Sequence, residues 1–420
     1  MDLTDYEKRM LDGEEGEAKR MSMEILYALG NVYGASRMVP IQSAHVLAVY
    51  PHLEASPEIM EKFAKAGGRF AVPTTVDPGH NEKNFDKWKE FPEPEHLKQN
   101  SIRLAKAVET MECIPNWSCT PYYQGNLPRK GAYISWAESS AISFANSVLG
   151  ARTNRTTIGV DIAAAITGRT PYFGLLLEES RYANARVVIE KQPSSMYDYN
   201  ILGYIIGKNL SDRIPAIEGL PESTTANDLK VLGAAAASRG VVPLYHAIGI
   251  TPEAKSREIT YGGKKPKVEL KIGTKEISEA ESDINTYASG NLDAILVGCP
   301  HPTIGEIAEL TCLINGRKVK KGMKFCLFIS ADVLHLAELM GFRRKIEDSG
   351  VDIFTGDCIL FCPVASWGWK NIVTNSAKYA NLLPSDPTYF KVLFTDLKGC
   401  VELGTKKGGI HGQKHSSPRS

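Results

Sequence analysis

The chain has 420 residues, a net charge of +1 at pH 7, 43% hydrophobic residues and 23% charged residues. This length allows two or three α/β domains or one large enzyme body, and the composition excludes disordered and fibrous proteins. So small a net charge gives no field to hold nucleic acid or an anionic membrane surface, and small-molecule ligands are expected instead.

The sequence contains no run of the ~18 to 20 apolar residues that a membrane helix requires. The N-terminus, MDLTDYEKRM, is acidic and polar, unlike a signal peptide. We therefore expect a cytoplasmic protein with no membrane or nucleic-acid partner. In the cytoplasm its cysteines are expected to be core residues, nucleophiles or metal ligands rather than disulfides.

The first quarter of the chain predicts alternating helices and short strands. Thr4 and Glu7 match a capping box, and the periodic segment up to residue 33 predicts two helices separated by Gly13 to Gly16. The next predicted elements are a strand at 37–41, a strand that ends near His45, a helix at 56–66, a strand at 69–72, a turn-rich loop at 74–86 and a charged helical region at 85–112.

The stretch from Trp117 to Arg155 has the composition of a functional site. It begins with a cysteine between a serine and a threonine, passes through a loop rich in Pro, Gly and Asn, and continues with short hydrogen-bonding side chains among small residues. A helix that only buries an apolar face would space its hydrophobic residues three and four apart, with solvated charges opposite. We therefore expect this stretch to bind a ligand.

The second half of the chain predicts an α/β architecture with a parallel sheet. From residue 293 strands and helices alternate regularly, which is typical of a doubly wound sheet whose ligands bind outside the carboxyl ends of the strands. The polar segment 405–420 is expected to be a disordered tail. Other predicted elements are a helix that ends before Gly168, a strand at 172–177, an apolar helix at 201–206, a strand at 241–249, an exposed hairpin or linker at 262–267 and a helix at 331–350.

Three of the eight cysteines follow regular elements and have polar or turn-forming neighbours: Cys119 in SCTP, Cys299 in GCPHP and Cys358 in GDC. Cys299 and Cys358 each follow a strand of the predicted sheet, so both are expected at the same edge. Three thiolates can hold a [4Fe-4S] cluster and leave one iron open as a Lewis acid. From spacing alone, a metal site, unconnected cysteines and a single nucleophilic cysteine remain open. The other five are expected to be structural, with Cys312 and Cys326 buried in the core. For Cys362, four residues after Cys358, a packing role is favoured and a ligand role is the alternative.

The chain resembles the aconitase X family in several long motifs that occur in the same order, up to about residue 404. These motifs are CTPYYQGNLP, SWAESSAISFANSVLGARTNR, VGCPH, TGDC and TNSAKYA. Members of this family are dehydratases, including phosphomevalonate dehydratase and cis-3-hydroxy-L-proline dehydratase. The resemblance implies one catalytic large-subunit domain over 1–404, with an aconitase-like body of several α/β subdomains and mostly parallel sheets around an iron–sulfur cluster.

The resemblance also implies a set of site residues. Cys119, Cys299 and Cys358 match the family's cluster cysteines, and the expected cluster is [4Fe-4S], with [2Fe-2S] as the alternative. Asn146 matches a substrate-binding asparagine and Lys378 the lysine of the last motif, so both are expected to bind substrate and to take part in catalysis. In this chemistry an open iron binds the departing hydroxyl while a base removes a proton from the neighbouring carbon. In this family a mobile domain carries a catalytic serine and is either fused to the large part or a separate small subunit. This chain matches the large part alone, so a small-subunit partner is expected.

Two loops depart from the phosphomevalonate branch of the family. That branch has Gly-Val-Ser and Asn-Pro where this chain has Ala48-Val49-Tyr50 and Asp77-Pro78, which are expected to contact substrate. An aspartate near a phosphate dianion would cost on the order of 1 kcal/mol, and the tyrosine adds bulk. The predicted function is therefore a hydro-lyase large subunit for an unphosphorylated hydroxy acid such as a hydroxyproline. The alternatives are a phosphomevalonate dehydratase large subunit and a non-catalytic scaffold that retains the fold.

Overall fold

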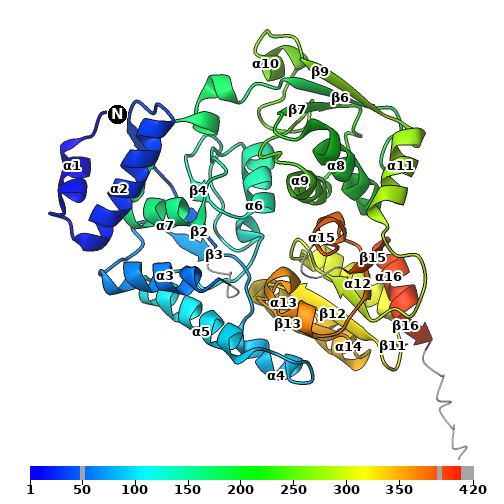
Figure 1. Ribbon diagram of the computed structural model, residues 1–420. Coiled ribbons are helices and arrows are strands. Elements are labelled where there is room, and N and C mark those ends of the chain that lie inside the picture. Colours follow the sequence, from blue (N-terminus) through cyan, green and yellow to red (C-terminus); the bar gives the residue numbers. More distant parts are fainter. Residues whose placement is uncertain (48–52, 386–389, 408–420) are drawn as a thin grey trace, which may run out of the picture.

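The computed structural model describes residues 1–47, 53–385 and 390–407 (Figure 1). In these ranges the chain forms three parallel sheets accompanied by helices, together with two small antiparallel strand pairs. Within the described part, no helix is long and apolar enough to cross a membrane. The predicted α/β class with mostly parallel sheets is confirmed.

The first sheet has three short parallel strands in the order β3-β2-β4. Strand β2 (Ala44–Val46) lies between β3 (Thr74–Val76) and β4 (Ser135–Trp136), and all three strands are buried. Buried polar side chains need hydrogen-bond partners. His45 and Thr75 supply one for each other, with 2.9 Å between Nδ1 and Oγ1, so a polar pair lies inside this sheet.

The helices of the first part begin as the sequence predicts. Thr4 caps α1 in a capping box with Glu7, and α1 ends at Gly13, before α2 starts at residue 17. The elements here are α1 (Asp5–Asp12), α2 (Glu17–Val32), the antiparallel pair β1 (Met38–Pro40) and β5 (Arg169–Pro171), α3 (Ala55–Lys65), α4 (Phe85–Trp88), α5 (Glu95–Thr110), α6 (Ser139–Phe144), a π-helix (Ala145–Leu149) and α7 (Ile158–Thr167).

Two strands predicted in this part are wrong. Residues 69–72 form no strand, and the following residues 74–76, assigned to a loop, form β3 because their backbone pairs with β2. Residues 172–177 form no strand either. Asn154 binds the carbonyl of Phe173 and the N–H of Leu175, at 3.0 and 2.7 Å, and thereby holds this segment as a 3₁₀ turn.

The second sheet has four parallel strands in the order β8-β7-β6-β9. The helices that pack on it, α8 and α9, touch closely: a Cβ added at Gly203 would lie 2.2 Å from the backbone oxygen of Leu232, so only glycine fits there. The strand predicted at 241–249 is reduced to two residues, because its Pro243 has no N–H to offer a sheet. The elements are β6 (Ala185–Ile189), α8 (Met196–Leu210), β7 (Pro215–Glu218), α9 (Ala226–Arg239), β8 (His246–Ala247), α10 (Arg257–Tyr261), β9 (Val268–Ile272) and α11 (Thr274–Ile284).

The third sheet has five parallel strands in the order β13-β12-β10-β14-β15, with β10 at the centre, as expected of a doubly wound sheet. The helix predicted at 331–350 is two helices, separated where Gly341 adopts a positive φ of 70°. The elements are β10 (Ala294–Val297), α12 (Ile304–Ile314), β11 (Arg317–Val319), β12 (Lys324–Ile329), α13 (Ala331–Leu339), α14 (Phe342–Asp348), β13 (Asp352–Thr355), β14 (Asn371–Thr374), α15 (Ala377–Leu382), β15 (Lys391–Phe394), α16 (Leu397–Gly404) and β16 (Thr405–Lys407).

The end of the described chain differs from the expected tail at its first residues. Residues 405–407 form β16, which pairs antiparallel with β11, and the rest of the predicted tail lies outside the described residues.

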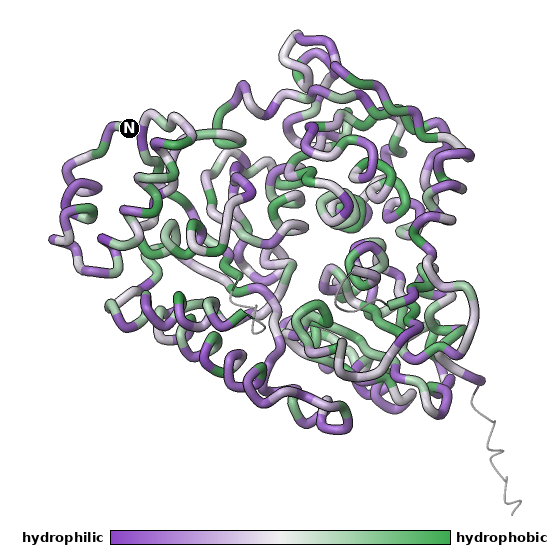
Figure 2. The backbone as a smooth tube through the Cα atoms, in the orientation of Figure 1, coloured by the Kyte–Doolittle hydropathy of each residue, from purple (hydrophilic) through white to green (hydrophobic). Residues whose placement is uncertain are grey.

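The hydrophobic core is divided between the three parts. One large cluster joins α8 and α9 of the second part to strands of the third sheet, whereas the first part has a cluster of its own around α2, α5 and α7. Figure 2 shows hydrophobic stretches in the inner helix α9 and hydrophilic stretches along the outer α5. The first part meets the third through the loops that follow its strands and through Trp88 of α4, which belongs to the large cluster and stacks on Phe354.

Candidate active site

The loops after the strands of the first and third sheets line one cavity of about 660 Å³. Backbone bonds hold two of these loops together: the N–H of Gly79 binds the carbonyl of Gly356 at 3.1 Å, and the N–H of Cys358 binds the carbonyl of Gly79 at 2.8 Å. The loop after β3 and the loop after β13 therefore enter the cavity side by side. Both sheets present the carboxyl ends of their strands, where α/β folds bind ligands.

Cys119, Cys299 and Cys358 all line this cavity. Cys299 lies close enough to the other two cysteines that an ionised Cys299 raises the pKa of both thiols. It follows Gly298, whose φ is +101° and at which an added Cβ would lie 2.1 Å from the backbone oxygen of Phe328. Only glycine allows the chain to leave β10 so close to β12 and to turn Cys299 into the cavity.

Burial raises the pKa of each of the three thiols, that of Cys299 to about 11. Three thiolates would therefore be stable here only with a metal or another cation beside them, because a coordinated thiol loses its proton. The backbone N–H of His301 donates to the Cys119 sulfur at 3.3 Å, and the Tyr379 hydroxyl lies 3.8 Å from the Cys358 sulfur. Such donors stabilise thiolate ligands, and this donor set fits an iron–sulfur cluster.

Lys378 and Glu138 form a buried ion pair at the cavity wall. Burial raises the pKa of Glu138, but the Lys378 ammonium, the Ser140 hydroxyl and the N–H of Ala141 outweigh burial and lower it to about 2. Burial disfavours the Lys378 ammonium, yet the charges of Glu138 and the nearby thiols raise its pKa above the ordinary value. Both groups are therefore charged at neutral pH, and a fixed ammonium faces the cavity.

Asp77 is buried at the cavity and is hydrogen-bonded to Nε2 of His45, with 3.4 Å between the atoms. Burial and the charge of Glu138 raise the pKa of Asp77 to about 6, while His45 and Lys378 oppose the rise. At pH 7 most of this carboxyl is ionised. The cavity thus contains a second carboxylate, and among the described residues no cation pairs it as closely as Lys378 pairs Glu138.

His301 is a buried neutral imidazole behind Cys119. Burial lowers its pKa to about 4. Its Nε2 binds the backbone oxygen of Asp357 and its Nδ1 the Ser118 hydroxyl, each at 3.2 Å. When Nε2 carries the ring proton and donates it to the Asp357 carbonyl, Nδ1 accepts from the Ser118 hydroxyl. These two hydrogen bonds hold the ring in one orientation.

One part of the cavity lining, called the rim here, consists of Arg155, Thr156, Thr157 and the first turn of α7. Thr157 caps α7 without a side-chain hydrogen bond, so the first N–H groups of the helix have no cap from that residue. Helix N-termini carry partial positive charge and favour anions. The lining thus combines these N–H groups with the carboxylates of Asp77 and Glu138.

Models of three aconitase X domains match almost the whole chain: the first domain over residues 1–179, the second over 183–282 and the third over 292–406. The chain belongs to the aconitase X family. Its three matched domains correspond to the three sheets, and the family predicted from the sequence motifs is confirmed.

Curated relatives in this family are dehydratases. The phosphomevalonate dehydratase large subunit of Methanocaldococcus jannaschii is 38% identical over 394 residues, which cover 92% of this chain and 96% of that protein. The cis-3-hydroxy-L-proline dehydratase of Pseudomonas aeruginosa is 35% identical over 406 residues, or 95% of this chain and 69% of that protein. The crystal structure of Thermococcus kodakaraensis aconitase X in its holo-form matches with a TM-score of 0.87 at 33% identity and covers 96% of this chain and 100% of that chain.

The structure brings together most of the residues that the aconitase X motifs indicate. The three cysteines, Asp77, Pro78 and Lys378 line the one cavity. Residues 48–50, the other predicted substrate contacts, lie outside the described residues.

Asn146 is the predicted site residue that the structure places elsewhere. It lies in the π-helix, fully buried, and is not among the described residues that line the cavity. Its amide nitrogen donates to the carbonyls of Thr153 and Pro243, both at 3.0 Å, and its oxygen accepts from the Thr153 N–H and from Arg181, at 3.0 and 3.1 Å. All its hydrogen-bonding capacity is therefore used within the protein.

Several site residues were not identified from the sequence: Glu138, His45 and His301. Glu138 stands in the SWAESS motif and caps α6, and an acid before two serines at a helix start is itself a capping signal. His301 lies two residues after Cys299 in VGCPHP. Their roles depend on partners far away in sequence, which the local pattern does not reveal.

The remaining cysteines largely follow the prediction. Cys326 is buried in β12 as expected, and Cys362 and Cys400 are buried too. The prediction for Cys312 is wrong: it is exposed, because its place on α12 faces outward while the core of that helix is formed by Ile307, Leu310 and Ile314.

Proposed function

We propose that this chain is the large subunit of a dehydratase that removes water from a small, unphosphorylated hydroxy acid. The observation that supports this function is the single cavity in which three cysteines meet the Lys378–Glu138 pair. The relatives of the chain are dehydratases of the same family. We place the protein in the cytoplasm, where its free cysteines stay reduced.

Cys119, Cys299 and Cys358 would hold an iron–sulfur cluster, for which we propose the [4Fe-4S] form, with [2Fe-2S] as the alternative. When bound, such a cluster supplies a Lewis-acidic iron that assists the departure of a hydroxyl group. The protein's own part is to keep the thiols together and to shield them. The His301 N–H and the Tyr379 hydroxyl, which lie beside two of the sulfurs, contribute to this.

Lys378 is proposed to bind the substrate carboxylate and to fix the reacting carbon against the cysteines. Glu138 keeps the ammonium charged and oriented, since it is itself held by the Ser140 hydroxyl at 2.5 Å and the Ala141 N–H at 2.6 Å. Charge-assisted bonds of this kind are stronger than neutral ones and position a ligand well. Asn146, by contrast, is proposed to act at a distance, by holding the segment around Thr153 and Arg181 in place.

Asp77 is the residue that favours an unphosphorylated substrate. Its carboxyl faces the cavity and is mostly ionised at pH 7 because its pKa is about 6. A phosphate dianion within ~4 to 6 Å would be repelled by on the order of 1 kcal/mol, whereas the ammonium of an amino acid would be attracted by a similar amount. A hydroxyproline-like substrate satisfies both Lys378 and Asp77.

We further propose a separate small subunit that supplies the catalytic serine. The archaeal relative at 38% identity is named a large subunit, and this chain covers 96% of it. By contrast, the chain covers 69% of the longer cis-3-hydroxy-L-proline dehydratase. Co-expression with a neighbouring small subunit is expected to produce turnover that the large chain alone does not give.

Phosphomevalonate is the second candidate substrate, favoured by one feature of the cavity. The rim formed by Arg155, Thr156 and the first turn of α7 suits an anion such as a phosphate. Several relatives with 38 to 39% identity are phosphomevalonate dehydratase large subunits.

A dehydration assay of the reconstituted enzyme separates the two substrates. Phosphomevalonate, cis-3-hydroxyproline and simple hydroxy acids are compared side by side, in the wild type and in the Asp77→Asn variant. We expect cis-3-hydroxyproline or another unphosphorylated acid to be the better substrate, and Asp77→Asn to shift kcat/KM toward phosphomevalonate by about tenfold, the effect of ~1.4 kcal/mol. Efficient turnover of phosphomevalonate by the wild type would show that Asp77 does not govern the choice.

A further inference from the structure

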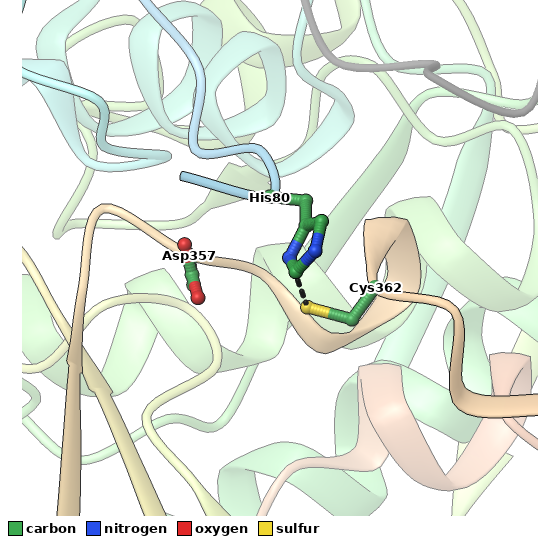
Figure 3. A group of neighbouring side chains, drawn as sticks. All are labelled: His80, Asp357 and Cys362. Atoms are coloured by element: carbon green, nitrogen blue, oxygen red, sulfur yellow. Dashed lines mark hydrogen bonds between the residues drawn. The ribbon is translucent and has the colours of Figure 1, made fainter. Parts of the chain in front are cut away.

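A second group of ligand-type side chains lies behind the cavity, outside the set described so far. His80, Asp357 and Cys362 are buried, and one donor atom from each lies within 4.8 Å of the other two (Figure 3). His80 belongs to the loop after β3, and the other two belong to the segment after β13. Three residues from distant parts of the chain thus bring nitrogen, oxygen and sulfur to one point.

His80 is held as a metal-binding histidine is held. Its Nε2 is hydrogen-bonded to the buried Glu93, whose other oxygen lies 3.2 Å from the Lys98 ammonium. Metal-bound imidazoles almost always give their outer N–H to a carboxylate, which fixes the tautomer and makes the inner nitrogen more basic. With the proton on Nε2, the lone pair of Nδ1 points to the Cys362 sulfur, 3.5 Å away.

Asp357 is also held in place by groups that do not compete for its free lone pairs. One carboxylate oxygen accepts from the Asn81 N–H at 2.7 Å, and the other accepts from the Trp88 indole N–H at 3.2 Å. The Asn84 side chain also donates toward this carboxylate. Its two oxygens offer four acceptor sites in all, so at least one stays free for a metal. The Trp88 ring itself is clamped between Phe354 and Trp367, with ring centroids at 3.8 and 4.4 Å, which makes the donor rigid.

The surroundings of His80, Asp357 and Cys362 favour a divalent cation. The group is enclosed, and aromatic rings form one of its walls: Phe85 lies 4.9 Å from the His80 ring, and the Trp88 stack stands behind Asp357. Buried anions are stable when they coordinate a metal, and one thiolate with one carboxylate balances a charge of +2. Thiolate, imidazole and carboxylate are each ligand types that Zn²⁺ accepts in a tetrahedral site.

We propose that His80, Asp357 and Cys362 bind one structural Zn²⁺ that is separate from the cavity cysteines. The fourth tetrahedral position is open to a water molecule or to the second carboxylate oxygen of Asp357. The ion would fasten the loop of the first matched domain to the segment of the third. Since Asp357 precedes Cys358, and the Cys362 sulfur lies 3.5 Å from the Cys358 carbonyl, the ion would also fix the position of a cavity cysteine.

Metal analysis of the full-length chain, purified anaerobically and incubated with Zn²⁺, tests this site. We expect about one zinc ion per chain in the wild type and a fall of about tenfold or more in Cys362→Ala and His80→Ala, because each loses a ligand. Cys326→Ala is the matched control, a buried cysteine in β12 without a histidine partner, and it keeps its zinc. Cys119→Ser keeps it as well, because its cysteine belongs to the cavity.

Zinc K-edge X-ray absorption of the wild type keeps the test decisive if a variant fails to fold. The proposed site gives one sulfur ligand together with nitrogen and oxygen ligands, whereas zinc bound by the cavity cysteines gives three sulfurs. Three sulfurs, zinc retained in a folded Cys362→Ala chain, or a wild type that stays free of zinc would each overturn the proposal. In those cases the three residues form a hydrogen-bonded packing group only.

Discussion

The cavity and the buried group behind it use the same residue types on two sides of one short segment, Asp357 to Cys362. In the cavity, Cys358 faces about 660 Å³ of open space with a lysine and two carboxylates around it. Behind the segment, Cys362 faces His80 at 3.5 Å with no comparable opening among the described residues. The open cavity can exchange small-molecule ligands, whereas the closed group could only retain a bound ion.

Similar side chains in these two regions differ in how completely their hydrogen-bonding groups are satisfied within the protein. In the closed group two of the three side chains have fixed partners outside it: Glu93 binds His80, and the N–H donors of Asn81 and Trp88 bind Asp357. The Cys362 sulfur lies 3.5 Å from both His80 Nδ1 and the Cys358 carbonyl oxygen. Among the described residues of the cavity, Asp77 has one side-chain hydrogen-bond partner, the His45 ring at 3.4 Å. The first N–H groups of α7 have no side-chain cap from Thr157. Incomplete local satisfaction is what leaves a site able to bind substrate.

The largest effect is expected from removing a cavity cysteine. Replacing Cys119, Cys299 or Cys358 by Ser is expected to abolish the cluster and with it all turnover, since three ligands cannot spare one. Iron and sulfide analysis of anaerobically purified chains measures the loss, with Cys326→Ser as the control. Iron lost from the control but kept in Cys299→Ser would contradict the ligand assignment, and an iron-free wild type would favour the scaffold alternative.

The next effect concerns the ion pair that orients the substrate. Lys378→Met is expected to lower kcat/KM by about 10² to 10⁴, because the cationic contact is lost and Glu138 is left buried and unpaired. Glu138→Gln is expected to cost about 3 to 5 kcal/mol of unfolding free energy for the same reason, and the double variant less than the sum of the two. Additive losses in urea unfolding would show that the two residues do not form a pair in solution.

A smaller effect is expected from Asn146, the predicted catalytic residue that lies away from the cavity. Asn146→Ala is expected to lower the unfolding free energy by about 1 to 3 kcal/mol, because its partners Thr153, Pro243 and Arg181 lose hydrogen bonds. In the folded fraction KM should change by less than about twofold, which corresponds to ~0.4 kcal/mol. A large rise in KM with unchanged stability would restore the direct substrate contact.

The smallest effect tests a buried acid below the rim of the cavity. Burial raises the pKa of Asp161 from its ordinary 3.8 to about 7, against the hydrogen bonds from Ser135 and Thr156. A carboxyl whose pKa is raised by folding stabilises the protein at low pH, and this contribution is lost as the pH rises toward 7. Wild type is therefore expected to lose about 1 to 2 kcal/mol relative to Asp161→Asn between about pH 5 and 7. Urea unfolding of both chains across this range measures the difference, and parallel curves would contradict it.

The order of elements was largely predictable because it depends on local patterns. The capping box at Thr4, the glycine that ends α7 and the alternation after residue 293 are all confirmed. The strands predicted at 69–72 and 172–177 failed, since short strands exist only where a neighbour offers its backbone. Residues 74–76 became β3 because β2 lies beside them, and no pattern within the segment says so.

The candidate site was predictable in its cysteines and unpredictable in its partners. Cys299 and Cys358 were placed correctly at one sheet edge by the rule that parallel strands end together. That Lys378 meets Glu138, 240 positions earlier, follows only from the packing of both α15 and α6 against α9. The aconitase X motifs pointed to Asn146, but only its neighbours show that its amide is already fully bonded.

The fold class, the family and the three cavity cysteines could be predicted from the sequence, because side-chain periodicity and motif order are present along the chain. Three contacts could not: the pairing of Glu138 with Lys378, the bond between Asp77 and His45, and the meeting of His80, Asp357 and Cys362. Those contacts depend on distance and burial in three dimensions, and both the strength of an ion pair and the pKa of an acid change with them.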